Sequence, residues 1–368
     1  MKVAYVSRLS LDRERGVLKK VASQVRAWRA YGEEVRLFAL AGTSRIWEGV
    51  ADLPVDIVLS GTRLMPLVRA YTLMKRTIAW HPDVVYVRWG PNYPSLRMLM
   101  KRLPTLVEIN TDDVAEFRVL LPRIKYLYHR LTRHHVLTSA AGFVCMTQEL
   151  AERFRKYRKP MIVVTNSINL SEYPQIPPTG NTNPRLVLMA NMPKDMQRID
   201  WHGIDKILWL ARHFPKWQFD LIGVEAKQIN LRNCRQPPNV TTHGVLGRMD
   251  YERILLQADV GLGTLALHRK NMDEACPLKV REYLAYGIPT IIAYRDTDFP
   301  DPVPFLLRLP NTSTNVMDHV FDIQQFAEAW TSKRIPRECT KHLDVQEKET
   351  RRLTFFRDVL GMSRIGHP

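Results

Sequence analysis

Short apolar runs alternate with longer amphipathic segments along almost the whole chain. Each run is long enough for one buried strand, and the segments between them repeat apolar residues at helical spacing, as residues 17–31 do before Gly32. A strand followed by a helix and another strand is typical of a parallel sheet covered by helices. The alternation therefore predicts an α/β protein built on parallel sheets.

The alternation occurs as two series, which suits a chain of 368 residues because compact domains usually hold about 100 to 200. A stretch rich in turn formers, 166–181, separates the series. Strands are predicted in the first series at 2–7, 34–40, 55–59, 84–88, 105–109, 142–146 and 161–165. The second series has predicted strands at 185–190, 217–222, 239–243, 260–265 and 289–293, and predicted helices at 204–213, 250–257 and 277–286. A last helix is predicted at 345–360.

Positive charge is concentrated in the first half of the chain. The net charge is +17, and residues 1–160 hold 28 Lys and Arg against 14 Asp and Glu. Such a surface attracts nucleic acid, anionic lipid headgroups or phosphorylated substrates, and charge alone does not choose among them. No apolar run approaches the roughly 20 residues of a membrane span, so we expect a cytoplasmic protein.

The segment 274–282, Glu-Ala-Cys-Pro-Leu-Lys-Val-Arg-Glu, carries the clearest chemical signal. It follows a predicted strand and a basic loop, and its proline predicts the first position of a helix. The backbone N–H groups of Leu278 and Lys279 would then point out of the helix start, which favours a phosphate there. The carboxylate of Glu282 suits a ribose diol, and that of Glu274 suits sugar hydroxyls beyond the phosphates. The segment therefore predicts a nucleotide-sugar site.

Together with its flanks, this segment resembles the retaining glycosyltransferases of the GT-B fold, family 4. Members of that family carry a Glu-x7-Glu motif followed by Ala-x-Gly-x-Pro, which is Ala-Tyr-Gly-Ile-Pro at 285–289 here. Three further stretches are similar to the family, so that the resemblance covers nearly the whole chain: Asn-Ser-Ile-Asn at 166–169, Trp-His-Gly-Ile-Asp-Lys at 201–206 and Ala-Asp-Val-Gly-Leu at 258–262.

The resemblance implies an α/β fold of the GT-B type, with two facing Rossmann-like doubly wound domains. Residues 1–170 are expected to bind the acceptor, residues 180–340 to bind the nucleotide-sugar, and residues 341–368 to form a helix that packs back on the first domain. Ligands in such sheets bind at the carboxyl ends of the strands. The active site is therefore expected in the cleft between the domains.

The resemblance also implies the roles of individual residues. Glu274 and Asn110 are expected to be catalytic, in the sense that they contact the transferred sugar. No metal ligand is expected. The donor is expected to be bound by Gly16, Asn191, His202, Gly203, Leu278, Lys279 and Glu282.

The sequence departs from the family at three places. Asn191 and His202 stand where the family has a phosphate-binding Arg and Lys, and compensation is expected from Lys279, Lys194 or Arg198. Asn110-Thr111 replaces a His-Asp pair, and Gly16 alone replaces two glycines.

Three other features have alternative interpretations. Asp296-Thr297-Asp298 matches an Asp-x-Asp metal motif, but two carboxylates in a polar loop are more often turn formers. Residues 123–135 mix basic and aromatic side chains at helical spacing, which suits either contact with anionic lipids or a solvated basic helix with aromatics in the core. The four cysteines are scattered singly and are expected to be reduced.

The activity implied is transfer of a sugar, with retention, from a UDP- or GDP-sugar to a saccharide or a polyprenyl-diphosphate-linked acceptor in bacterial-type surface polysaccharide synthesis. No cofactor and no essential metal are expected. The expected partners are the donor, the acceptor and an anionic membrane surface bound peripherally on its inner face, but no nucleic acid. Two other classes stay open, namely a nucleotide-sugar epimerase of GT-B architecture and a non-enzymatic polyanion-binding protein.

Overall fold

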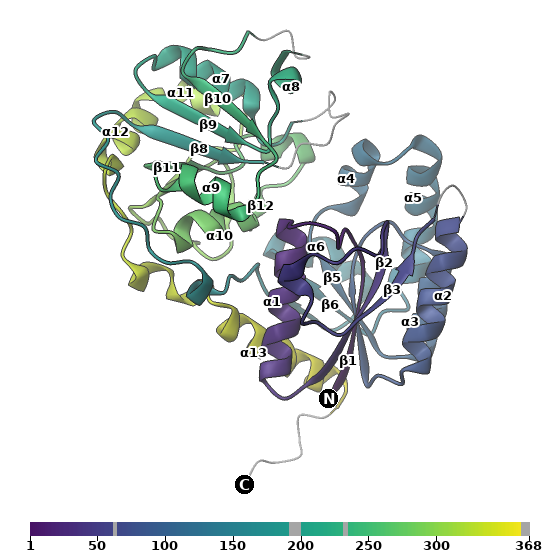
Figure 1. Ribbon diagram of the computed structural model, residues 1–368. Helices are drawn as coiled ribbons and strands as arrows, with labels where there is room; N and C mark the ends of the chain where they lie inside the picture. The colour runs from purple at the N-terminus through teal and green to yellow at the C-terminus, as the bar shows by residue number, and fades with distance from the viewer. Residues whose placement is uncertain (62–64, 191–199, 231–234, 362–368) are drawn as a thin grey trace. The chain divides into compact units, whose positions relative to one another are not determined.

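The computed structural model describes residues 1–61, 65–190, 200–230 and 235–361. Within them the chain forms two α/β units (Figure 1). The first unit combines Met1–Ser167 with the C-terminal segment that begins at Val345, and the second is the continuous stretch Ile168–Asp344. The predicted fold class, two Rossmann-like domains with parallel sheets, is confirmed.

The first unit is built on a seven-stranded parallel sheet in the order β3-β2-β1-β4-β5-β6-β7. Its strands are β1 (Lys2–Leu9), β2 (Glu34–Ala41), β3 (Val55–Leu59), β4 (Val84–Arg88), β5 (Thr105–Ile109), β6 (Gly142–Cys145) and β7 (Met161–Val163). Its helices are α1 (Gly16–Ala30), α2 (Met65–Ala79), α3 (Pro94–Arg102), α4 (Asp113–Leu120), α5 (Arg123–Leu137), α6 (Gln148–Phe154) and α13 (Val345–Val359), with 3₁₀ turns η1 (Glu48–Val50) and η2 (Arg155–Tyr157). The strand order reverses at β1, because β2 and β3 extend the sheet on one side and β4 starts the other.

The second unit repeats this plan with a six-stranded parallel sheet in the order β10-β9-β8-β11-β13-β15. Its strands are β8 (Arg185–Met189), β9 (Gln218–Ile222), β10 (Val240–Gly244), β11 (Val260–Leu262), β13 (Thr290–Ile292) and β15 (Leu306–Arg308), and a separate two-stranded sheet pairs β12 (Glu274–Ala275) with β14 (Arg295–Asp296). Its helices are α7 (Ile204–His213), α8 (Ala226–Asn230), α9 (Arg248–Leu255), α10 (Leu278–Ala285), α11 (Asn315–Asp318) and α12 (Val320–Trp330), with 3₁₀ turns η3 (Leu170–Glu172), η4 (Leu267–Lys270) and η5 (Arg337–Leu343). The order reverses between β8 and β11.

The C-terminal helix α13 completes the core of the first unit. Phe356 is fully buried, and its ring centroid lies 5.3 Å from that of Trp28 on α1 and 5.1 Å from that of Tyr86 on β4. Trp28 in turn stacks on Tyr5 of β1. Sheet, first helix and last helix therefore share one aromatic cluster, although α1 and α13 are more than 300 residues apart in sequence.

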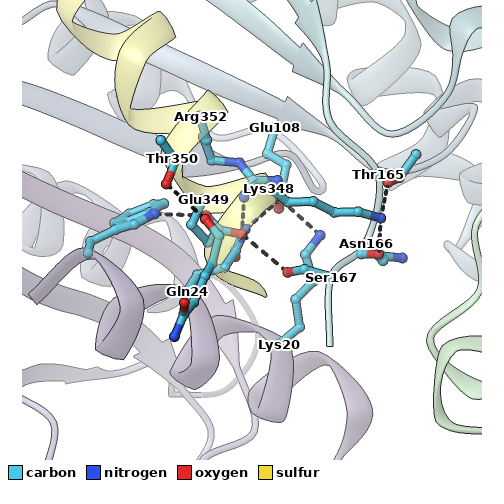
Figure 2. A network of polar contacts seen from close by, with 12 residues as sticks. Lys20, Gln24, Glu108, Thr165, Asn166, Ser167, Lys348, Glu349, Thr350 and Arg352 are labelled. Carbon is cyan, nitrogen blue, oxygen red and sulfur yellow. Dashed lines mark hydrogen bonds and ion pairs between the residues drawn. The ribbon is translucent and has the colours of Figure 1, made fainter. Parts of the chain in front are cut away.

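A buried polar network ties the same helix to α1 and to the segment that follows β7 (Figure 2). The carboxylate of Glu349 accepts a hydrogen bond from the indole N–H of Trp28 at 2.8 Å and pairs with Arg352, and all three side chains are buried. The ammonium group of Lys348 donates to the hydroxyl of Thr165 at 2.5 Å, where the chain leaves the first unit. Since buried charges need partners, this network specifies a single position for α13 against the rest of the first unit.

Among the residues described, no helix is both long and apolar enough to cross a lipid bilayer.

The Glu349→Ala variant should lower the free energy of unfolding by about 3–5 kcal/mol, because it leaves the Arg352 guanidinium buried without its carboxylate. Glu347→Ala, at an exposed position on the same helix, should change it by less than about 0.5 kcal/mol. Urea unfolding followed by circular dichroism measures both. Equal midpoints for the two variants would contradict this role of Glu349.

Candidate functional site

The candidate donor site lies at the carboxyl ends of β8 and β11 in the second unit. These neighbouring strands flank the point where the strand order reverses, which is where open parallel sheets bind ligands. Side chains reach this edge from the start of α10 and from the turn before α7.

Lys279, on the first turn of α10, reaches the end of β11. Its ammonium nitrogen donates to the carbonyl oxygen of Gly263 at 3.1 Å and lies 3.3 Å from Nδ1 of His202. Burial of this nitrogen lowers the pKa of Lys279 to about 7, although the charge of Asp200 acts in the opposite direction. The site therefore holds a cation whose protonation responds to pH near neutrality.

The turn that carries His202 and Gly203 is organised by Asp200. The buried carboxylate of Asp200 accepts hydrogen bonds from the backbone N–H groups of His202 (2.9 Å), Gly203 (3.2 Å) and Ile204 (2.6 Å). Gly203 has a φ of 80°, in the left-handed region that favours glycine, and precedes the first residue of α7. The N-terminus of α7 is thus occupied by a protein carboxylate, and the imidazole of His202 lies beside Lys279.

The N-terminus of α10 has backbone N–H groups with no backbone partner among the described residues, as the sequence predicts, but the helix starts one residue later than predicted. Pro277 is not the first helical residue but precedes the helix, with an extended backbone at φ −70° and ψ 137°. Its carbonyl oxygen accepts the N–H of Val280 at 3.1 Å, as expected of the residue before a helix. The N–H groups of Leu278 and Lys279 come before this first bond and make no backbone hydrogen bond within the described ranges.

Glu282 lies one turn further along α10 and is buried. Its Oε2 accepts a hydrogen bond from the hydroxyl of Tyr251 on α9 at 3.1 Å. The next residue, Tyr283, fixes the helix to the sheet, because its hydroxyl accepts the N–H of Met189 at 2.5 Å and its ring covers Gly261. A Cβ at position 261 would lie 2.5 Å from that ring, so only glycine fits below α10.

Glu274 lies in β12, which pairs with β14. Its carboxylate is partly buried and lies 3.5 Å from the guanidinium of Arg295. The two glutamates that frame the motif therefore differ in environment, one in a short strand beside an arginine and the other within a helix beside a tyrosine.

The Asp296-Thr297-Asp298 motif is held by a buried arginine. Arg281 lies 2.6 Å from a carboxylate oxygen of Asp296 and 2.7 Å from one of Asp298. The backbone N–H of Asp298 also donates to Asp296, which makes this carboxylate a turn former. Among the described residues, no group of three or more His, Cys, Asp or Glu side chains is arranged to hold a metal ion.

In the first unit, Asn110 follows β5 and belongs to a network of charges. Its Oδ1 accepts from Lys20 at 2.9 Å and from Arg88 at 2.6 Å. Its Nδ2 donates to the carbonyl oxygen and the carboxylate of Glu108 at 3.3 and 3.1 Å. All four hydrogen-bonding positions of the amide are therefore in use. Gly16, the first residue of α1, is exposed and is not part of this network.

Three residues assigned to diphosphate binding or to its compensation, Asn191, Lys194 and Arg198, lie outside the described residues. In the basic loop before the motif, Arg269 forms a two-point ion pair with Asp205 at 2.6 and 2.9 Å. Its guanidinium thus has a partner within the protein.

Two residues that hold the site's loops in place without contacting its ligand, Asp200 and Arg281, were not identified from the sequence. Asp200 could have been found from its position before a predicted helix, since Asp commonly caps helices. Arg281 has no such signal, because its two partners come 15 and 17 residues later and only the fold brings them together.

Comparison with solved structures identifies the architecture as the GT-B fold. Sucrose-phosphate synthase from Thermosynechococcus elongatus has a TM-score of 0.74 at 13% identity, over 98% of this chain and 100% of that one. HepE from Anabaena, in complex with UDP and glucose, has a TM-score of 0.66 at 12% identity, over 96% and 99%. A putative UDP-N-acetylglucosamine 2-epimerase from Listeria monocytogenes has a TM-score of 0.61 at 13% identity, over 100% and 98%. At these identities the likeness shows the fold alone.

A comparison with protein families adds a sequence match. Residues 15–166, most of the first unit, match the glycosyl transferase 4-like domain. A comparison with curated proteins found no match.

Proposed function

We propose that the chain is a glycosyltransferase that moves a sugar, with retention, from a UDP- or GDP-sugar to a saccharide or a lipid-linked saccharide. The single observation that carries this proposal is Lys279 at the open N-terminus of α10, beside the strand-order reversal of the second unit. The glycosyl transferase 4-like match of the first unit and the complex of HepE with UDP and glucose support it.

In the proposed mechanism, the diphosphate of the donor is held by the Lys279 ammonium and by the N–H groups of Leu278 and Lys279. As the bond between the sugar and the diphosphate breaks, an acceptor hydroxyl bonds to the sugar on the same face and gives its proton to the leaving diphosphate. The fixed donors stabilise the negative charge that grows on this diphosphate. Glu282 binds the ribose, and Glu274 positions the sugar hydroxyls. His202, next to Lys279, is a further phosphate ligand, and Gly203 gives the turn its left-handed backbone. No metal enters this mechanism.

An epimerase is the second candidate function, because a putative 2-epimerase shares the fold over the whole chain. The two activities differ in whether an acceptor is consumed. A nucleotide-sugar incubated with the protein alone should keep its configuration; conversion to an epimer would contradict the transferase proposal.

A UDP-sugar or GDP-sugar at about 100 times its Kd should stabilise the protein by about 2.7 kcal/mol, a thermal shift of a few degrees. Glu282→Ala should lose this shift because the ribose loses its carboxylate. Glu328→Ala, at an exposed position on α12, should keep it. Differential scanning fluorimetry measures all three proteins. The donor site is wrong if no nucleotide-sugar shifts the wild type or if both variants respond equally.

Donor affinity should fall as the pH rises above 7. The pKa of Lys279 in the free protein is about 7, so at higher pH diphosphate binding must first protonate the amine, at a cost of up to about tenfold in Kd per pH unit. Lys279→Arg should bind with little pH dependence, because a guanidinium stays charged. Calorimetry with the stabilising nucleotide between pH 7 and 9 tests this. Parallel pH profiles for both proteins would contradict the role of Lys279.

We further propose that the first unit binds an anionic membrane surface through α5. The buried face of this helix carries charge, since His129 and Arg133 pair with Asp113 at 2.7 and 2.6 Å. Its exposed side carries an apolar stripe: Ile124, Leu127, Tyr128 and Leu131 are 84, 52, 38 and 67% exposed. The aromatic ring of Tyr128 is thus on the surface and not in the core, where one alternative placed it. Exposed basic side chains flank the apolar stripe, as in helices that lie in the bilayer interface: Arg123, Lys125 and Arg130.

Vesicles that contain phosphatidylglycerol should co-sediment with the protein, and pure phosphatidylcholine vesicles should do so much less. Replacing Ile124 and Leu131 together by Glu should weaken binding at least about tenfold, because each buried aliphatic side chain contributes about 1.5 kcal/mol or more. The matched control replaces Val245 and Met249, 72 and 77% exposed in the second unit, by Glu and should bind as the wild type does. Equal binding to both lipids would count against the proposal.

A further inference from the structure

A pocket in the first unit lies at the carboxyl ends of β1, β2 and β4, whereas the candidate donor site belongs to the second unit. It spans the β1/β4 boundary, where the strand order of this sheet reverses. Its volume is about 50 Å³, several times the space that one water molecule needs. Much of its wall is aliphatic, from the three strands and from α2 and α3: Val6, Leu40, Val87, Leu73, Met74 and Leu96.

Two arginines add positive charge to this largely apolar wall, which also includes Ser7 and Tyr93. Arg8 follows the buried part of β1 and is exposed, and Arg88 is the last residue of β4, with its side chain 20% exposed. Within the described part of the chain, Arg88 bonds through Nη1 alone, to Glu108 at 3.3 Å and to Asn110 at 2.6 Å. Its Nε and Nη2 therefore keep their donors for a ligand.

The network behind Arg88 has more positive than negative charge. Glu108 is fully buried, and its carboxylate also pairs with the buried Lys20 at 2.9 Å (Figure 2). Burial would raise the pKa of Glu108, but Lys20, Arg88 and Arg352 together hold it well below its usual range. One carboxylate thus faces two cations, Lys20 and Arg88, while Arg352 has Glu349. A bound anionic ligand would neutralise the excess positive charge of this network.

Asn110 holds Arg88 in place. Its amide oxygen accepts from Arg88, and its other hydrogen bonds go to Lys20 and Glu108, so no group of Asn110 is left for a sugar. In this arrangement Arg88 contacts the ligand and Asn110 is a positioning residue.

We propose that this pocket binds an alkyl phosphate group of the acceptor. The phosphate oxygens accept hydrogen bonds from Arg88 and Arg8, and the first carbons of the chain enter the aliphatic pocket. This inference rests on the proposed function, because it names the class of acceptor. The residues of the pocket, however, are not those of the donor site, so that binding to each can be measured by itself. Arg88 is then the residue that selects a phosphorylated acceptor over a neutral one.

The test compares three probes by calorimetry on the full chain: n-hexyl phosphate, inorganic phosphate and n-hexyl β-glucoside. Hexyl phosphate should bind at least about tenfold more tightly than either of the others, because only it offers both the charge and the chain. Arg88→Gln should remove about tenfold of its affinity. Arg76→Gln on α2, whose guanidinium pairs with Asp56, is the matched control and should bind as the wild type does.

Two further variants separate binding from folding. Ala70→Leu, whose longer side chain would fill the pocket, should bring the affinity of hexyl phosphate down to that of inorganic phosphate. Asn110→Ala should lower the ratio of hexyl phosphate to hexyl glucoside affinity, which a purely structural defect would not change.

The proposal is overturned if inorganic phosphate or hexyl glucoside binds as tightly as hexyl phosphate, or if Arg88→Gln and Arg76→Gln bind it equally. Nucleotide-sugar stabilisation measured on the same samples keeps the two proposals apart. Hexyl phosphate binding at Arg88 without any nucleotide-sugar response would leave this inference standing and contradict the donor site.

Discussion

The parallel direction of the strands is the constraint on which the rest of the structure depends. Every strand pairing in both large sheets is parallel, so every connection must cross a face of its sheet. Within each sheet, the carboxyl ends of all strands therefore lie at the same edge. In each unit the first strand, β1 or β8, becomes internal when the chain changes direction across the sheet. Adjacent crossovers then diverge at that point and leave room for ligands. The two candidate binding regions are consequences of the same topology.

The cations at these two regions differ in chemistry. Lys279 is an ammonium whose pKa is lowered by burial, with the carbonyl oxygen of Gly263 and the ring of His202 as neighbours. Arg88 is a guanidinium that stays charged and is oriented by Glu108 and Asn110. Lys279 therefore suits a ligand group whose charge changes during a reaction. Arg88 suits the binding of a group that stays anionic.

Much of the fold could be predicted from the sequence because the strands are short, apolar and well separated. The strands β3, β4 and β5 and the helix α7 have the predicted bounds, whereas β11 ends three residues earlier than predicted, since the apolar residues after Leu262 form the loop at the site. The start of α10 could be located because proline marks helix starts. That Pro277 is extended and precedes the helix could not be predicted from the sequence. The engagement of Asn110 by Lys20, 90 residues earlier, depends on tertiary contacts that leave no local pattern in the sequence.

The discontinuous first unit has a consequence for synthesis of the chain. The second unit is one unbroken stretch, so it can fold as soon as Asp344 has left the ribosome. The first unit begins 167 residues earlier but lacks Phe356 and Glu349 until α13 has been synthesised. Until then the indole of Trp28 has Tyr5 as a neighbour but lacks both the ring of Phe356 and its hydrogen-bond acceptor, Glu349. The unit that begins first is therefore completed after the second one, and a chain truncated before α13 would expose its aromatic core.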